Sequence, residues 1–208
     1  MLCIIGIGGF GRETLCCFID ILNNPNAKLE ELVCFMVDDD EYKEKELKGI
    51  PIYPLSQLDT KKHKVVVAVG NPIVRENIIK RLPANTIYST LIHPSATVSK
   101  WVVIGKGSIV CAGSVITTDV KIGNHAHINL NTTIGHDCEI GDFFTSAPSV
   151  NISGICTIGD KVYFGSGSCI KQQVSICSNV IIGMGGIVIK DINVSGTYVG
   201  NPVKKIEK

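Results

Sequence analysis

The chain has 208 residues, of which 45% are hydrophobic and 19% are charged, and its formal net charge at pH 7 is +1. This composition supplies a sizeable core and excludes intrinsic disorder, and the small net charge argues against nucleic acid or an anionic membrane surface as the main partner. No uninterrupted apolar stretch reaches the roughly 18 residues of a membrane helix, and the first residues lack a basic, cleavable leader. Nine cysteines without CxxC spacing favour a reducing compartment, so we expect a cytoplasmic protein without membrane or nucleic-acid partners.

Residues 1–92 alternate between strand-like and helix-like segments. A short strand precedes a glycine-rich turn and a helix that extends to about residue 22, and further strands are expected in 32–40, 64–72 and 86–94, with a helix in 73–82. This alternation predicts a small parallel α/β sheet. The boundary of this domain lies near Asn85 or at His93–Pro94. We place it at the latter, because proline biases the preceding residue away from regular structure, and we expect domains at 1–92 and 93–208.

The first turn carries a G-x-G-x-x-G pattern in Gly6, Gly8 and Gly11. Glycines let the backbone approach a phosphate, and the N-terminus of the following helix favours an anion. Asp38 and Asp39 fall at the end of the second strand, where a Rossmann fold places a ribose-binding acid. The alternative is a tight turn and a solvated acidic loop without a ligand. A domain of some 90 residues leaves no second α/β substrate domain, so we favour a sugar nucleotide over NAD.

Residues 96–197 divide into hexads without an insertion, and their third positions are apolar in sixteen of seventeen cases. This row runs Val98, Ile104, Val110, Ile116, Ile122, Ile128, Ile134, Ile140, Ser146, Ile152, Ile158, Phe164, Ile170, Ile176, Ile182, Val188, Val194. A period of six excludes an amphipathic helix of about 3.6 residues per turn, but it stays in phase with strand alternation. The tract therefore predicts a β-solenoid in which three hexads close a triangular coil.

Five motifs together resemble one bacterial family, the sialic acid O-acetyltransferases and UDP-amino-sugar N-acetyltransferases. They are GIGGFGR at 6–12, a strand that ends in Asp-Asp, HPSA at 93–96, IGHDCEIGD at 134–142 and YVGNPVKK at 198–205. The resemblance covers nearly the whole chain. It implies left-handed solenoid coils, acetyl-CoA as acetyl donor, a sugar nucleotide held by the α/β domain, and a homotrimer with active sites between adjacent solenoids.

The resemblance also implies roles for individual residues. His136 becomes the general base and Asp137 its support, and Asn129 lines the acceptor pocket. The nucleotide contacts are Gly8, Gly9, Phe10, Gly11, Arg12, Asp38 and Asp39. The acetyl-CoA contacts are Thr145, Gly154, Ser166, Gly183 and Met184. Phe10 and Thr145 stand where many relatives carry histidine.

The repeat itself places His136 at a corner, with Gly154 stacked one coil later. Glycine there leaves room beside the imidazole and offers a backbone N–H to a thioester oxygen. The same coils suggest that Val102 and Val120 face outward, where a neighbouring subunit covers them. We expect no metal, because His125, His127 and His136 lack the HxxxxH spacing of the zinc-binding γ-carbonic anhydrases, and we interpret His125 and His127 as interface or surface residues.

The leading hypothesis is an acetyl-CoA-dependent enzyme that acetylates the amino group of a nucleotide-linked amino sugar, such as a UDP-4-amino-4,6-dideoxy sugar, for surface glycan or glycoprotein synthesis. O-acetylation of sialic acid is the alternative within this class. A sugar-nucleotide-binding trimer without catalysis and an NAD enzyme are alternatives from other classes. The sugar and the nucleotide base stay open.

Overall fold

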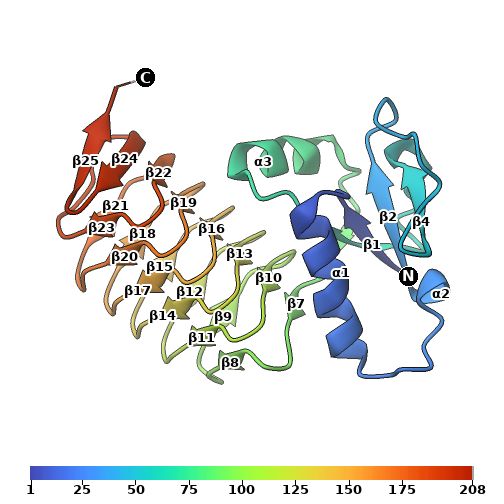
Figure 1. The fold of residues 1–208 in the computed structure, drawn as a ribbon, viewed down its shortest axis with the longest axis horizontal. Coiled ribbons are helices and arrows are strands. Elements are labelled where there is room, and N and C mark those ends of the chain that lie inside the picture. Colours follow the sequence, from blue (N-terminus) through green and yellow to red (C-terminus); the bar gives the residue numbers. More distant parts are fainter. Residues whose placement is uncertain (208) are drawn as a thin grey trace.

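The computed structural model describes residues 1–207. An α/β domain and a solenoid lie side by side, and a C-terminal hairpin lies at the far end of the solenoid (Figure 1). Among residues 1–207 no helix has the length and apolar character needed to cross a membrane. Both parts of the predicted architecture, the α/β domain and the β-solenoid, are confirmed.

A six-stranded sheet forms the α/β domain, in the order β3-β4-β2-β1-β5-β6. All neighbouring strands are parallel except β3 and β4. The strands are β1 (Leu2–Ile5), β2 (Val33–Val37), β3 (Glu46–Leu47), β4 (Ile50–Pro54), β5 (Lys64–Val67) and β6 (Ile87–Tyr88). The helices are α1 (Gly9–Leu22), α2 (Leu29–Leu32) and α3 (Pro72–Arg81), with a 3-10 turn η1 (Leu55–Gln57).

Side-chain alternation along β1 buries both faces of this sheet. Leu2 and Ile4 pack in one cluster with Leu15 of α1, while Cys3 and Ile5 pack in another cluster with Ile78 of α3. A sheet covered on both faces requires the continuous apolar strands that the sequence shows. The connections proceed from β1 to β2 and β4 on one side and then to β5 and β6 on the other. The carboxyl ends of β1 and β5 therefore flank the point where the strand order reverses, and ligands bind at such a point in open α/β sheets.

The solenoid has three flat sides built from two-residue or slightly longer strands that pair in parallel. Face 1 contains β7 (Leu91–Ile92), β10 (Ile109–Val110), β13 (His127–Ile128), β16 (Thr145–Ser146), β19 (Tyr163–Phe164), β22 (Val180–Ile182) and β24 (Gly196–Gly200), closed by antiparallel β25 (Val203–Ile206). Face 2 contains β8 (Thr97–Val98), β11 (Val115–Ile116), β14 (Thr133–Ile134), β17 (Asn151–Ile152), β20 (Cys169–Ile170) and β23 (Ile187–Val188). Face 3 contains β9 (Val103–Ile104), β12 (Lys121–Ile122), β15 (Glu139–Ile140), β18 (Thr157–Ile158) and β21 (Ser175–Ile176).

The predicted row of third positions forms the core of this solenoid. Ile134 pairs with Ile116 and Ile152 in neighbouring coils, and all three side chains are buried. Ser146 interrupts the row but is also buried, and its hydroxyl accepts a hydrogen bond from the N–H of Asn129 at 3.2 Å. The row ends before Val194, which is 57% exposed. Ile192 instead pairs with Ile176 and fills that place.

The first position of each hexad also points inward, which corrects one expectation. Val120 is fully buried in the core cluster, and Val102 packs against that cluster. Val120 is therefore not available to a neighbouring subunit, and Val102 is only partly exposed. The reason is that the chain turns through a corner just before this position. Every sixth residue from Gly107 to Gly185 has a left-handed backbone with φ between 54° and 72°, and this repeated conformation turns the residue after it toward the core.

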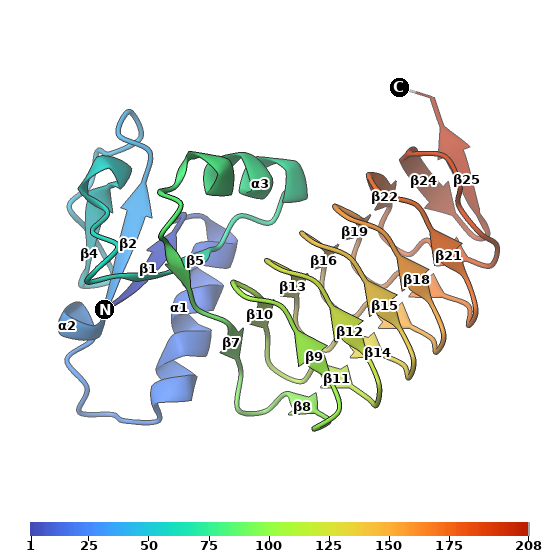
Figure 2. The same ribbon diagram turned by 180° about the vertical axis from the view of Figure 1, so that it is seen from behind.

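The α/β domain covers the outer side of face 1 at its first coils, where α3 lies between the sheet and the solenoid in both views (Figures 1 and 2). Strand β7 already pairs with β10, so solenoid pairing starts at Leu91, just before the expected boundary. Arg75 of α3 is fully buried at this contact. It donates hydrogen bonds to five backbone carbonyl oxygens at 2.7 to 3.2 Å, those of Val69, Gly70, His125, Phe143 and Phe144.

Candidate active site

His136 and Asp137 form a hydrogen-bonded pair at the corner between faces 2 and 3. The Nδ1 atom of His136 lies 2.7 Å from a carboxylate oxygen of Asp137. Asp137 occupies the left-handed corner position, with φ of 57°, a conformation that aspartate tolerates better than most residues. Both side chains are more than half exposed. Because an ionised carboxylate only accepts hydrogen bonds, Nδ1 carries the proton and Nε2 is left free to accept one.

Gly154 shapes the space on the other side of the imidazole. A β-carbon placed on Gly154 would lie 2.7 Å from Nε2 and 2.8 Å from Cε1 of His136, so only glycine lets the ring lie in this position. The His136 carbonyl in turn accepts the N–H of Ile155 at 2.8 Å. The N–H of Gly154 has no acceptor within residues 1–207. The corner therefore presents a proton acceptor and a free N–H donor next to each other.

The glycine loop lies as predicted between β1 and α1. Gly8 is the N-cap of α1, and Gly8 and Gly9 border open space. Gly11 is buried, and a β-carbon there would collide with the carbonyl oxygen of Gly6, so this glycine permits close packing of the helix on the strand. Arg12 is exposed. The loop can thus bring exposed backbone close to an anion at the helix N-terminus.

The side chain of Phe10 does not lie on this open surface but packs in the contact between the two domains. Its side chain is half-buried, and its ring lies 4.6 Å from the ring of His127. This position differs from the expected nucleotide contact. The aromatic ring is used to seat the α/β domain on face 1 of the solenoid.

The acids after β2 line a cavity of about 550 Å³, together with Leu55, Ser56 and Arg81. Asp38 pairs with Arg81 through two contacts of 3.0 Å, and the ion pair raises the pKa of Arg81. Asp39 accepts the N–H of Ser56 at 3.0 Å, and its hydrogen bonds with Ser56 lower the pKa of that carboxyl. Arg81 was missed from the sequence, where a cation in the last turn of a helix already fits the helix dipole.

A second cavity, between the α/β domain and the solenoid, was also missed from the sequence. Gly70 and Asn71 follow β5 on the side where the strand order reverses. Asn71 caps α3 by accepting the N–H groups of Ile73 and Val74. With Pro72 and Ile73 they line a cavity of about 450 Å³ whose opposite wall is Lys161, Tyr163, Asn179 and Ile181 of the solenoid. The signal for these residues was present, because G-N-P directly follows an apolar strand.

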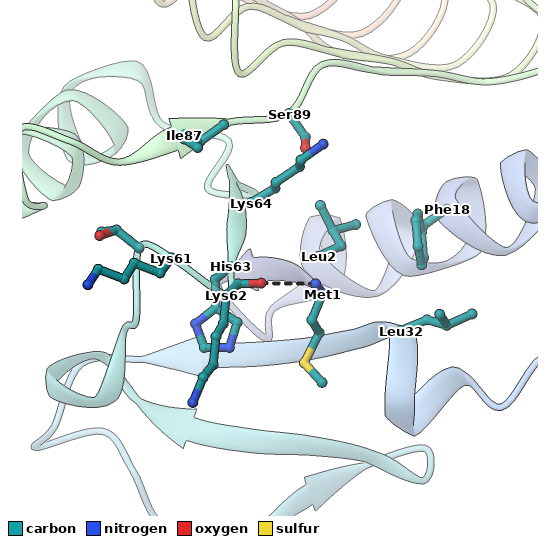
Figure 3. Close-up of a pocket in the computed structure, with 11 residues that line it drawn as sticks. Met1, Leu2, Phe18, Leu32, Lys61, Lys62, His63, Lys64, Ile87 and Ser89 are labelled. Atoms are coloured by element: carbon teal, nitrogen blue, oxygen red, sulfur yellow. Dashed lines mark hydrogen bonds between the residues drawn. The ribbon is translucent and has the colours of Figure 1, made fainter.

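Another cavity lies at the opposite, amino ends of the strands and contains no predicted site residue. It measures about 370 Å³, and three lysines, Lys61, Lys62 and Lys64, lie on its rim (Figure 3). The Met1 ammonium donates to the Lys62 carbonyl at 3.0 Å. The candidate site is therefore confined to the carboxyl ends of the strands and to the solenoid.

Thr145 does not lie where donor binding was expected. Its side chain is buried beneath the α/β domain. The hydroxyl accepts a hydrogen bond from Arg75 at 2.9 Å and donates one to the Gly70 carbonyl at 3.1 Å. The prediction of a thioester contact is therefore not supported, because both hydrogen-bonding roles of this hydroxyl are satisfied inside the domain contact.

His125 and His127 were interpreted as interface or surface residues; they are buried at the contact between the two domains of one chain and do not lie on the surface. One ring nitrogen of His127 lies 3.1 Å from Arg75 and the other lies 2.9 Å from the Val67 carbonyl. Burial, with a smaller contribution from the Arg75 charge, lowers the pKa of His125 to about 4 and holds that of His127 well below its usual value. Both imidazoles are thus neutral near pH 7. Among residues 1–207 no group of three His, Cys, Asp or Glu side chains could hold a metal ion.

The remaining predicted residues lie at two different corners of the solenoid. His136, Asp137 and Gly154 occupy the corner between faces 2 and 3. Asn129, Ser166, Gly183 and Met184 occupy the corner between faces 1 and 2, where Met184 is 80% exposed. Face 2 separates the two sets, so one chain does not bring them together.

Face 2, together with the corner between faces 1 and 2, carries no charged side chain. Asp, Glu, Lys and Arg are absent from the six segments that form this strip, which are 93–98, 111–116, 129–134, 147–152, 165–170 and 183–188. Face 3 differs, because Lys121 and Glu139 form an ion pair of 3.0 Å on its surface. A surface strip depleted of charge is typical of the buried core of a protein interface.

Comparisons with known proteins bear on the fold and on the reaction. A family model described as the PglD N-terminal domain matches residues 1–82. The GDP-perosamine N-acetyltransferase of Escherichia coli O157:H7 is 31% identical over 216 residues, which cover 99% of this chain and 96% of that protein.

Two solved structures are similar over their whole length. The acetyltransferase domain of PglB from Neisseria gonorrhoeae FA1090 in complex with acetyl coenzyme A aligns with a TM-score of 0.88 and 30% identity, covering 99% of this chain and 98% of that chain. A histidine-to-asparagine mutant of perosamine N-acetyltransferase from Caulobacter crescentus, in complex with CoA and GDP-perosamine, aligns with a TM-score of 0.87 and 26% identity, covering 100% and 97%.

Proposed function

This chain belongs to the family of acetyl-CoA-dependent amino-sugar N-acetyltransferases that combine a PglD N-terminal domain with a hexapeptide-repeat solenoid, and we propose that its acceptor is GDP-perosamine, a GDP-linked 4-amino-4,6-dideoxymannose. The full-length similarity to an enzyme named for this substrate supports a GDP-linked acceptor over the UDP-linked example considered above. The observation that carries the catalytic part of the proposal is the His136–Asp137 pair lying against Gly154.

In the proposed reaction, Nε2 of His136 removes a proton from the sugar amine as its nitrogen attacks the thioester carbonyl. The new N–C bond forms while the C–S bond breaks, and the proton passes to the departing CoA thiolate. Asp137 stabilises the imidazolium that exists between these transfers. The free N–H of Gly154 donates to the carbonyl oxygen while it carries negative charge.

We propose that the α/β domain holds the nucleotide at the carboxyl ends of its strands. Gly8 and Gly9 offer open backbone at the N-terminus of α1 for the diphosphate. Asp38 and Arg81 bind the ribose or the base at the end of β2, in the cavity that they line. Gly70 and Asn71, which line the second cavity, lie at the point where the strand order reverses.

We propose a homotrimer whose active site joins two subunits. His136 and Gly154 belong to one corner and Asn129 and Met184 to another, so a cyclic head-to-tail contact can bring the two corners from different copies together. The charge-free strip on face 2 supports a contact at this place. The nine cysteines are all free thiols, which supports a reducing, cytoplasmic location.

Thiol release from acetyl-CoA in the presence of single acceptors tests the proposed reaction. We expect release with GDP-perosamine, and little or none with a UDP-linked 4-amino-4,6-dideoxyglucose or with free sialic acid. Thiol release with sialic acid alone would show that the enzyme O-acetylates sialic acid and does not N-acetylate an amino sugar. Nucleotide-sugar binding without thiol release would indicate a non-catalytic trimer, and NADH oxidation would indicate a dehydrogenase.

Mixing two inactive variants tests the shared site. His136→Ala and Asn129→Ala remove groups from different corners, so mixed trimers contain some sites with both wild-type residues. We expect activity to reappear after the variants are unfolded and refolded together, and light scattering to show three chains. Failure to recover activity, or an active monomer, would overturn the shared site while leaving the reaction itself untouched.

A further inference from the structure

Ile155 has an unfavourable backbone conformation directly above the catalytic pair. Its φ is 60°, in the left-handed region that β-branched residues avoid. The other residues with this conformation between Gly107 and Gly185 are Gly, Asp, His, Asn, Phe, Ser, Lys and Gln. Ile155 is therefore the only β-branched residue at a repeated corner position. Asparagine or glycine would satisfy the corner with less strain.

Core packing does not explain this isoleucine, because its side chain is 47% exposed. The corresponding positions in the two adjoining coils are polar: Asp137 and Gln173. The N–H of Ile155 donates to the His136 carbonyl at 2.8 Å, and Gly154 next to it contacts the imidazole. An exposed apolar residue thus directly follows the glycine that lies against the imidazole, and its backbone is held in a conformation that isoleucine disfavours. Strained residues of this kind concentrate at ligand sites.

From this placement we infer that Ile155 selects the sugar by contacting its C6 methyl group, so that the enzyme prefers 6-deoxy sugars. This inference rests on the proposed function. In a 4-amino-4,6-dideoxy sugar the amine is on C4 and the methyl group is on C5, the adjacent ring carbon. When the amine reaches Nε2 of His136, the methyl group comes to the same corner. A sugar with a hydroxyl on C6 would have to bury that polar group against isoleucine, which is unfavourable.

The test compares kcat/KM for GDP-4-amino-4,6-dideoxymannose and for its analogue with a hydroxyl on C6. We expect the wild-type enzyme to prefer the 6-deoxy sugar by about 10- to 100-fold, the range that an apolar contact with a substrate provides. Ile155→Asn should reduce this preference to about 2-fold or less. The same variant should have a higher Tm than the wild type, because asparagine relieves the backbone strain. Ile155→Val is the matched control, since it stays apolar and β-branched and should keep the preference.

Other outcomes would overturn the inference. An active Ile155→Asn enzyme with unchanged preference would do so, as would an equal loss on both sugars with a fall in oligomer size, which would assign Ile155 to the subunit contact. A change in the ratio of acetyl-CoA to propionyl-CoA use, without a change in sugar preference, would assign it to the acyl group. A wild-type enzyme that used both sugars equally would contradict only this inference, whereas one that used neither would contradict the proposed function as well.

Discussion

The imidazole of His136 lies against Gly154 so closely that a β-carbon on the glycine would be 2.7 Å from Nε2. Gly154 does not have a left-handed backbone, so alanine can adopt its conformation. What alanine cannot do is leave the ring in place. Because the ring is more than half exposed, it can swing outward without disturbing the solenoid core.

Gly154→Ala is therefore expected to lower kcat by about 100-fold, the loss that a displacement of about 1 Å produces in a reacting geometry. Thermal unfolding should be nearly unchanged. Thr118→Ala is the matched control, because Thr118 occupies the same corner position one coil before His136. A Gly154→Ala enzyme with normal kcat would mean that the position of this ring is irrelevant to the reaction.

Asp137 is expected to contribute less than His136. Its contact with Nδ1 is short, at 2.7 Å, but both side chains are exposed to water, and exposed ion pairs are worth about 0.2–1 kcal/mol. Asp137→Asn should therefore lower kcat by less than about tenfold, measured with both substrates saturating. Glu139→Gln, which removes a nearby exposed acid, should have no effect. A loss as large as that of His136→Ala would indicate that the carboxylate itself takes part in the chemistry.

Substitution of Asp38 tests whether the α/β domain binds the nucleotide sugar while the solenoid binds acetyl-CoA. Hydrogen bonds to charged groups contribute about 1.5–3 kcal/mol, so Asp38→Ala should raise the KM of the nucleotide sugar at least tenfold. The KM of acetyl-CoA should stay unchanged, because the donor is bound by the solenoid. Asp59→Ala, at the opposite end of the sheet, is the control. Equal changes in both KM values would show that the two substrates are not assigned to separate domains.

Because it contains buried neutral histidines, the folded protein is expected to lose stability at acid pH. The pKa of His125 is lowered to about 4 in the folded protein, chiefly by burial and then by Arg75 and Lys106, with a small opposing effect of Asp142. Between pH 6.5 and 4 the unfolded chain binds a proton that the folded chain does not, so stability falls as the pH is lowered through this range and is constant above it.

Between pH 6.5 and 5 this loss amounts to about 2 kcal/mol for His125. Phenylalanine preserves the ring that packs between Tyr88 and Phe143 but cannot titrate. Urea unfolding of His125→Phe should therefore show a smaller loss of stability over this pH range than the wild type. Identical pH profiles would place the acid-sensitive group elsewhere.

The repeat predicted the solenoid core well, because the position of a residue in its hexad decides whether it points inward. The same reasoning applied to the first position would have found Val120, since that position is also filled by small or apolar residues such as Ala126, Cys138 and Val162. The repeat failed at Val194 because the closing strands change the register, and Ile192 takes the inward place.

Contacts between distant parts of the chain could not be predicted in this way. Thr145 and His127 occupy outward positions of face 1, and a repeat does not reveal what covers an outward position. The cover is α3, whose Arg75 is joined to carbonyls more than fifty residues away rather than to an acid. The charge pattern of the sequence does not predict this contact. A buried arginine whose hydrogen bonds are made to backbone carbonyls needs no carboxylate partner.

The corner at His136 could be predicted from the sequence. The hexad position of His136 places it at a corner, and Gly154, eighteen residues later, stacks beside it in the next coil.

The most direct test of the whole account is kcat for His136→Ala with saturating acetyl-CoA and GDP-perosamine, supported by acetyl-CoA binding and Tm. Loss of a general base typically lowers the rate by about 10²–10⁴-fold, and we expect a loss in this range with donor binding and Tm preserved. A kcat close to that of the wild type would contradict the catalytic role of this histidine and the mechanism built on it.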